Sequence, residues 1–142
     1  MPLKQIYHGS KEYQQMIKLR NDILRKPLGL SFSEKELEEE KNNLLIGAFD
    51  EDELIGCCML TPVDSQCAKL RQMAVLKNQQ GKGIGDSIIQ FTENIARDKG
   101  YKVLLMHARD TAIGFYEKYG YKVKGDKFIE VNVSHHVMEK EL

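Results

Sequence analysis

Three closely spaced glycines, Gly81, Gly83 and Gly85, lie between an apolar segment at residues 70–76 and an amphipathic segment that runs to Arg97. The apolar segment predicts a strand and the amphipathic segment a helix, so the glycines form a strand-to-helix turn. Glycine has no side chain to block a ligand, and the first N–H groups of a helix lack internal partners and carry the positive end of its dipole. This combination predicts a phosphate or pyrophosphate site.

The spacing of the glycines excludes two common phosphate loops. The turn is not a P-loop, because no Gly-Lys-Ser/Thr follows four spacer residues, and its third glycine comes one residue too early for Gly-x-Gly-x-x-Gly. What remains is Gln80-x-x-Gly83-x-Gly85, which resembles the pyrophosphate-binding signature of the GNAT acetyltransferase superfamily, Gln/Arg-x-x-Gly-x-Gly/Ala. For the hexapeptide alone, a tight turn without a ligand is the alternative.

Two further segments resemble the same superfamily. Ala112-Ile-Gly-Phe-Tyr-Glu-Lys-Tyr-Gly-Tyr121 is similar to its penultimate helix, in which a Phe-Tyr pair precedes a glycine and an aromatic residue. Phe128-Ile-Glu-Val-Asn-Val-Ser-His-His-Val-Met138 is similar to the small bacterial ElaA-like subgroup, which reads Phe-x-Glu-x-Gly-Ile-Pro-His-x-x-Met. Asn132 and Ser134 replace the glycine and proline of that pattern, so the resemblance does not fix the direction of His135.

The order of predicted elements agrees with a GNAT fold over residues 1–142 as a single domain. We expect a mixed α/β architecture, with a splayed mixed sheet of six to seven strands flanked by about four helices. Hydrophobic periodicity and turn residues predict strands at 3–7, 44–49, 54–60, 70–76, 101–108, 121–124, 128–133 and 135–139, with a Gly125-Asp126 turn between the sixth and seventh. Helices are predicted from Ser10 to Pro27, from a Ser33 capping box to residue 41, from the glycine turn to residue 97, and at 112–119. Glu38, Glu39 and Glu40 are interpreted as an exposed face.

Composition narrows the possible partners. The chain of 142 residues carries 21 basic and 21 acidic side chains, which gives no general charge for nucleic acid or an anionic membrane. The N-terminus lacks the apolar segment of a signal peptide, so a cytoplasmic location is expected. Cys57, Cys58 and Cys67 form an odd set without a CxxC pair, and neither a disulfide framework nor a metal site is expected.

The resemblance implies acetyl-CoA as cosubstrate, bound where the sheet splays between residues 70–76 and 103–108. Backbone N–H groups of the turn would hold its pyrophosphate, and main-chain groups of the preceding strand would pair with the pantetheine arm. Two residues of the second motif complete the implied set. By motif position these coenzyme-binding residues are Met73, Ala74, Val75, Gln80, Gly81, Lys82, Gly83, Ile84, Gly85, Asp86, Phe115 and Lys118.

The implied chemistry is attack of a neutral amine on a thioester, with release of a thiolate. An alkylamine with a pKa of about 10.4 lies about 3.4 units from its neutral form at pH 7, roughly 4.6 kcal/mol, so a base or a water path is needed. His135 is a candidate base. Tyr116 matches the family's leaving-group acid, and hydrogen bonding to the thiolate is its expected role, because full proton transfer from a tyrosine to a thiolate is uphill by about 2 kcal/mol. A purely structural role is the alternative for both residues.

The resemblance places Arg20 and Arg25 where the first helices of the family build the acceptor site, which hints at an anionic acceptor. Arg109, near the end of its strand, is also expected to bind the acceptor. The sequence thus predicts an acetyl-CoA-dependent N-acetyltransferase that acts on a primary amine of a small molecule, peptide or protein, as a monomer or homodimer. Two alternatives are a non-catalytic acyl-CoA sensor and an interaction domain on the same fold.

Overall fold

The computed structural model describes residues 2–142, which form one seven-stranded sheet in the order β1-β2-β3-β4-β5-β7-β6. The strands are β1 (Leu3–Ile6), β2 (Leu44–Asp50), β3 (Glu53–Pro62), β4 (Cys67–Val75), β5 (Val103–Arg109), β6 (Lys122–Glu130) and β7 (Val133–Glu141). The α-helices are α1 (Lys11–Arg20), α2 (Glu34–Glu38), α3 (Ile84–Asp98) and α4 (Ile113–Glu117). None of the helices in this part of the chain combines the length and apolar character needed to cross a bilayer.

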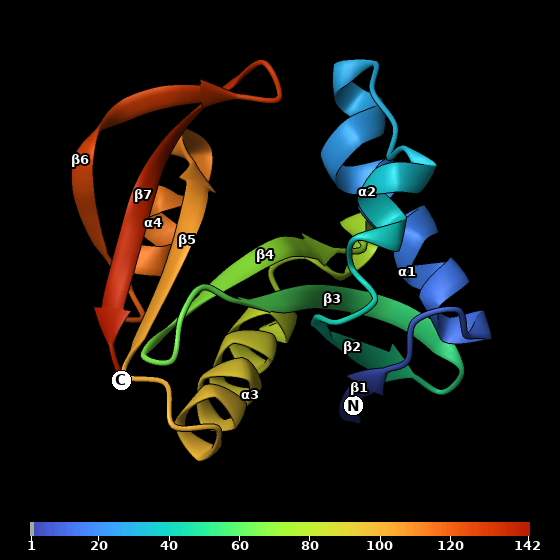
Figure 1. The fold of residues 1–142 in the computed structure, drawn as a ribbon. Helices are drawn as coiled ribbons and strands as arrows, with labels where there is room; N and C mark the ends of the chain where they lie inside the picture. The colour runs from blue at the N-terminus through green and yellow to red at the C-terminus, as the bar shows by residue number, and fades with distance from the viewer. Residues whose placement is uncertain (1) are drawn as a thin grey trace.

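The sheet splits between its fourth and fifth strands. β4 and β5 run parallel and pair over only three residues, ending at Lys69 and Leu105, whereas every other neighbouring pair is antiparallel. Beyond Lys69 the two strands diverge, and Figure 1 shows β5, β7 and β6 turned away from β1 to β4. This architecture confirms the predicted mixed, splayed sheet.

Both faces of the first four strands are covered by helices. The apolar face of α3, including Ile84 and Ile88, packs against β2 and β3 on one side. On the other side, Tyr13 and Met16 of α1 pack against β3 and Ala74. Local signals start these helices as predicted, since the Ser10 hydroxyl caps α1 and Ser33 and Glu36 form a capping box on α2.

The segment after α1 differs from the single predicted helix. A π-helical turn at Asn21–Arg25 and a 3-10 turn at Lys26–Leu28 follow Arg20, and Gly29 ends the run at φ 73°. A π-helical turn inserts an extra residue into the helical ladder and so rotates the residues that follow it. This turn places Leu24 and Arg25 beside β4 at the split in the sheet.

The prediction that Glu40 lies on an exposed face is wrong. Glu40 is 4% exposed, and its carboxylate accepts hydrogen bonds from both terminal nitrogens of Arg20 and from the Tyr13 hydroxyl. A charge of this kind is buried only when it is paired, and Arg20 is its partner. The pair joins α1 to the segment after α2.

The predicted turn at Gly125-Asp126 is also wrong. β6 runs through both residues, with a bulge between Lys124 and Phe128 that absorbs the φ of 79° at Gly125. The hairpin turn lies instead at Val131 and Asn132, which both have positive φ and connect the paired residues Glu130 and Val133. Because the turn lies at Val131 and Asn132, β7 begins earlier than predicted. The register of β7 on β5 places His135 opposite Arg109.

Candidate active site

The glycine turn has unpaired backbone donors. Within residues 2–142, the N–H groups of residues 81–86 donate to no backbone or side-chain acceptor, and the first internal bond of α3 runs from the Ser87 N–H to the Gly83 carbonyl. No side chain caps the helix. A Cβ atom at Gly81 or Gly83 would project into open space. An open row of six donors at the positive end of a helix fits a pyrophosphate.

Residues around the turn also make contacts within the protein. Gln80 folds back, and its side-chain amide donates to the Val75 carbonyl at 3.0 Å, so in this structure it braces the turn and does not cover it. Gly85 is required for packing, because a Cβ there would lie 3.0 Å from the Phe115 ring. Phe115 thereby fixes α4 against the start of α3. Lys82 and Lys118 are exposed, and Asp86 accepts a hydrogen bond from Gln90.

The strand that leads into the turn has one free edge. Ala74 and Val75 pair with β3, but pairing between β4 and β5 has already ended at Lys69, so the opposite edge of residues 70–75 has no strand neighbour. A β-bulge places Gln72 and Met73 opposite the single residue Cys58, with Gln72 at φ 57°. A bulge leaves one residue outside the ladder, which frees a backbone group near Met73. The free edge fits the amide-bearing pantetheine arm.

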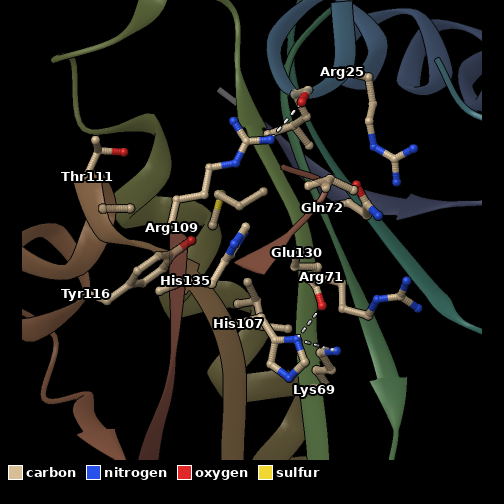
Figure 2. Close-up of a pocket in the computed structure, with 16 residues that line it drawn as sticks. Arg25, Lys69, Arg71, Gln72, His107, Arg109, Thr111, Tyr116, Glu130 and His135 are labelled. Atoms are coloured by element: carbon tan, nitrogen blue, oxygen red, sulfur yellow. Dashed lines mark hydrogen bonds and ion pairs between the residues drawn. The ribbon is translucent and has the colours of Figure 1, made fainter. Parts of the chain in front are cut away.

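A pocket of about 330 Å³ opens at the split between β4 and β5. β4, β5, the β6–β7 hairpin, the π-helical turn and the start of α4 all contribute to its walls. Figure 2 shows these side chains converging from elements far apart in the sequence. They are Leu24, Arg25, Lys69, Leu70, Arg71, Gln72, Met73, His107, Ala108, Arg109, Thr111, Ala112, Tyr116, Glu130, Val131 and His135.

Strand alternation explains which side chains enter the pocket. Ala68, Leu70, Leu104, Met106 and Met138 lie in the core beneath α3 and α4. Their neighbours in sequence must face the other side of the sheet, where the pocket lies. Of these neighbours, Lys69, Arg71 and His107 line the pocket, and Arg109 and His135 follow at the same spacing.

Tyr116 reaches the pocket from the α4 side. Its side chain is 7% exposed, and its hydroxyl has no hydrogen-bond partner among the described residues. In Figure 2 the hydroxyl points toward the space beside His135 and Arg109. Burial raises the pKa of Tyr116, so this group stays protonated and acts as a hydrogen-bond donor.

His135 is held in a defined tautomer. Its Nδ1 lies 2.7 Å from the Val133 carbonyl, which only accepts, so Nδ1 carries the proton and Nε2 is the free acceptor of the neutral ring. The ring is 4% exposed and stacks on Phe128. His136 faces away and contacts Asp110 at 2.8 Å, as expected for adjacent strand residues.

The three predicted acceptor-binding arginines separate in the structure. Arg25 and Arg109 line the pocket, and an Arg109 nitrogen donates to the Leu24 carbonyl at 2.7 Å. Arg20 does not line the pocket, because its fully buried side chain is bound to Glu40, and the structure does not support its expected role in acceptor binding. Lys69 and Gln72 line the pocket without having been predicted. The alternation of cationic and apolar residues in Lys69-Leu70-Arg71 could have predicted that Lys69 faces the pocket. The position of Gln72 depends on the bulge, which the sequence pattern does not show.

A polar chain crosses the lower wall of the pocket. His107 Nδ1 lies 2.9 Å from a Glu130 oxygen and 3.3 Å from the Lys69 ammonium, and Figure 2 shows both contacts. Nδ1 cannot donate to Glu130 and accept from Lys69 at the same time. The shorter distance indicates that Nδ1 carries a proton and donates it in a hydrogen bond to the Glu130 carboxylate. In the described part of the chain, no three His, Cys, Asp or Glu side chains are grouped to hold a metal ion.

Comparison with known proteins agrees with this geometry. A family model described as an acetyltransferase (GNAT) domain matches residues 13–142. The uncharacterized N-acetyltransferase YjcF of Bacillus subtilis is 26% identical over 139 residues, which cover 96% of this chain and 97% of YjcF.

Two solved structures share the fold. The crystal structure of Escherichia coli ElaA has a TM-score of 0.86 at 15% identity, covering 99% of this chain and 100% of that one. A GNAT family acetyltransferase from Elizabethkingia anophelis with acetyl-CoA bound has a TM-score of 0.76 at 21% identity, covering 99% and 97%. At such identities these structures show the fold alone, whereas the family model covers most of the sequence. The chain therefore belongs to the GNAT family of acyl-CoA-dependent N-acetyltransferases.

Proposed function

We propose that this enzyme transfers the acetyl group of acetyl-CoA directly to a primary amine of a small molecule, peptide or protein. The observation that supports this most is the meeting of the buried Tyr116 hydroxyl and the buried His135 imidazole in one pocket, beside the free edge of β4. Acetyl-CoA supplies the activated acyl group as a thioester. The Elizabethkingia anophelis relative, which has acetyl-CoA bound, supports the choice of cosubstrate.

The chain offers two successive contacts for this cosubstrate. The six free N–H groups of residues 81–86 are suited to the pyrophosphate. The unpaired edge of β4 at Met73, Ala74 and Val75 is suited to the amides of pantetheine. Both contacts use main-chain groups, so they lead from the turn toward the pocket without depending on particular side chains.

His135 is proposed to take the proton from the amine. An alkylamine needs about 4.6 kcal/mol to lose its proton at pH 7, and a positioned base provides a route for it. Nε2 is the free nitrogen because Nδ1 is fixed on the Val133 carbonyl. The stacking of the ring on Phe128 keeps it in this orientation.

The bulge and Tyr116 are proposed to stabilise negative charge. A backbone N–H freed at Gln72–Met73 supplies a donor for the charge that develops on the acyl oxygen. The Tyr116 hydroxyl, which has no partner within the described chain, supplies a donor for the sulfur. Because burial raises its pKa, Tyr116 donates a hydrogen bond and keeps its proton.

His135→Gln is expected to lower kcat/KM by about 100-fold at pH 7, the size of a typical general-base contribution. The defect should shrink as pH rises toward the pKa of the amine, because more of the acceptor is then already neutral. The matched control is His136→Gln, whose ring faces away. It should remain within about twofold of the wild type. A defect in His135→Gln that stays constant with pH would argue against the role as a base.

Tyr116→Phe is expected to lower kcat by about 10- to 100-fold and to leave the Kd for coenzyme A within about twofold. Losing a hydrogen bond to a charged group costs about 1.5–3 kcal/mol. The folded protein should be unaffected, because the hydroxyl has no partner among residues 2–142. Tyr101→Phe, outside the pocket, serves as control in the same rate assay. Wild-type turnover in Tyr116→Phe would remove this residue from the mechanism.

The proposed function is tested by measuring free thiol released from acetyl-CoA in the presence of a panel of primary amines, with mass spectrometry of the acetylated products. Amine-dependent release is the expected result. Coenzyme binding in a thermal-shift titration without release would indicate an acyl-CoA sensor. No shift with coenzyme would indicate an interaction domain.

A further inference from the structure

The pocket concentrates positive charge in a chain that has none overall. Basic and acidic residues number 21 each in the whole sequence. Among the pocket-lining residues, by contrast, Arg25, Lys69, Arg71 and Arg109 are cationic, and Glu130 is the one carboxylate. Such an imbalance in a recess indicates that an anion belongs there.

Three of these cations, Lys69, Arg71 and Arg109, lack a carboxylate partner within residues 2–142. Arg25 is paired with Glu36 at 2.9 Å, and Glu130 is bound to His107 beside Lys69. Within residues 2–142, Arg71 and Arg109 form no salt bridge, and Arg109 donates only to the Leu24 carbonyl. Their guanidinium groups are therefore available to a ligand.

The cations also oppose one another. Burial and the neighbouring charge of Arg71 lower the pKa of Lys69, and burial and the charge of Arg25 lower the pKa of Arg109. Half-buried cations that repel one another raise the electrostatic free energy of the pocket. A bound anion removes this penalty.

The position of the cations separates them from the coenzyme phosphates. The donors that fit the pyrophosphate are at residues 81–86, and the free edge at residues 73–75 lies between them and Arg71 along the chain. Arg71 and Arg109 instead line the same pocket as Tyr116 and His135. The anion they fit therefore belongs to the acceptor and not to the coenzyme.

We propose that the acceptor amine also carries a carboxylate or phosphate group, which Arg71 and Arg109 bind while the amine faces His135. The inference rests on the proposed function and specifies its substrate class. A guanidinium group offers paired N–H donors that match both oxyanions. Arg109 is held in position by its bond to Leu24, and Figure 2 shows it on the same side of the pocket as Tyr116 and His135.

Paired acceptors test the charge preference. β-Alanine is compared with β-alaninamide, and O-phosphoethanolamine with ethanolamine, by kcat/KM at saturating acetyl-CoA. In at least one pair the anionic member should be preferred by about tenfold or more, and the pair in which this occurs identifies carboxylate or phosphate. The β-alanine pair is biased against the proposal. The amine of β-alaninamide is less basic than that of β-alanine, so more of it is neutral and reactive at the same pH. Equal or better use of both neutral members would overturn the inference.

Arg71→Gln tests the assigned residue. It should raise KM for the preferred anionic acceptor by about tenfold or more, and leave kcat/KM for the neutral member and KM for acetyl-CoA within about twofold. The control is Arg97→Gln on α3, outside the pocket, which should change none of these values. An equal loss for both members of the pair would overturn the assignment.

A binding measurement separates this inference from the proposed function. The unfolding temperature of the coenzyme A-saturated protein is measured with N-acetyl-β-alanine and with inorganic phosphate, since the coenzyme then occupies the glycine turn. A rise that Arg71→Gln abolishes supports the anion site even if no amine is acetylated, in which case the proposed function fails alone. Acetylation without charge preference and without such a rise overturns the anion site alone.

Discussion

Replacing Gly83 with tryptophan is expected to abolish coenzyme A binding, with an increase in Kd of at least about 1,000-fold, in a protein that remains folded. Gly83 lies at the start of α3 with φ 81°, and a Cβ there meets no protein atom within 4 Å. The added side chain would fill the space into which the free N–H groups of residues 81–86 point. Isothermal titration calorimetry with coenzyme A measures the effect.

Gly100 provides a matched control at the other end of the same helix. It has φ 88° and equally open surroundings, so Gly100→Trp imposes a similar left-handed backbone penalty of about 1–2 kcal/mol. Both variants should lose similar stability, but Gly100→Trp should bind coenzyme A like the wild type. Unchanged affinity in Gly83→Trp would contradict the assignment of the turn.

Glu40→Gln is expected to lower the free energy of unfolding by about 3–5 kcal/mol, because it leaves the buried Arg20 without a counter-charge. Arg20 is 0% exposed. The Glu40 carboxylate accepts hydrogen bonds from both terminal nitrogens of Arg20 and from the Tyr13 hydroxyl. Total stability of a domain is only about 5–15 kcal/mol, so this is a large fraction. Urea unfolding followed by circular dichroism measures it.

The double variant Arg20→Met/Glu40→Met separates the cost of a broken pair from the value of the pair. Replacing both charges with apolar side chains should recover most of the lost stability, because no buried charge then remains unpaired. KM for the acceptor should stay within about twofold of the wild type, since Arg20 is outside the pocket. A loss below about 1 kcal/mol in Glu40→Gln would contradict the role assigned to this pair.

The parts of the fold that could be predicted are those specified by neighbouring residues. The Ser10 cap, the Ser33–Glu36 capping box and the glycine turn each depend on residues within a few positions of one another. Resemblance to the family motif predicted Tyr116 as a pocket residue. Strand alternation predicts that His135 and His136 lie on opposite faces, as the structure shows.

The parts that could not be predicted depend on distant contacts. Glu40 appeared solvated because its partner Arg20 is twenty positions away in the sequence. The turn at Val131 and Asn132 uses positive φ at a β-branched residue, which local preferences disfavour, whereas Gly125 offered a better local signal and proved to lie in a bulged strand.

Tyr116, His135, Arg25 and Arg109 were predicted, but other features of the pocket are hidden in the sequence. The bulge at Gln72 brings Arg71 and Ala74 to the same face of the sheet, so alternation counted from either end of β4 fails at this point. The cluster of Arg25, Lys69, Arg71 and Arg109 joins the π-helical turn, β4 and β5, and a neutral composition gives no sign of it.

The central claim, that the free amides of residues 81–86 bind the pyrophosphate of the cosubstrate, is tested most directly by NMR. Amide ¹H–¹⁵N spectra are recorded while coenzyme A is added to the ¹⁵N-labelled protein. The largest shifts should occur at residues 81–86, with smaller ones at residues 73–75 along the free edge of β4. Saturation with coenzyme A that leaves these resonances in place, while shifts gather elsewhere, would contradict the account.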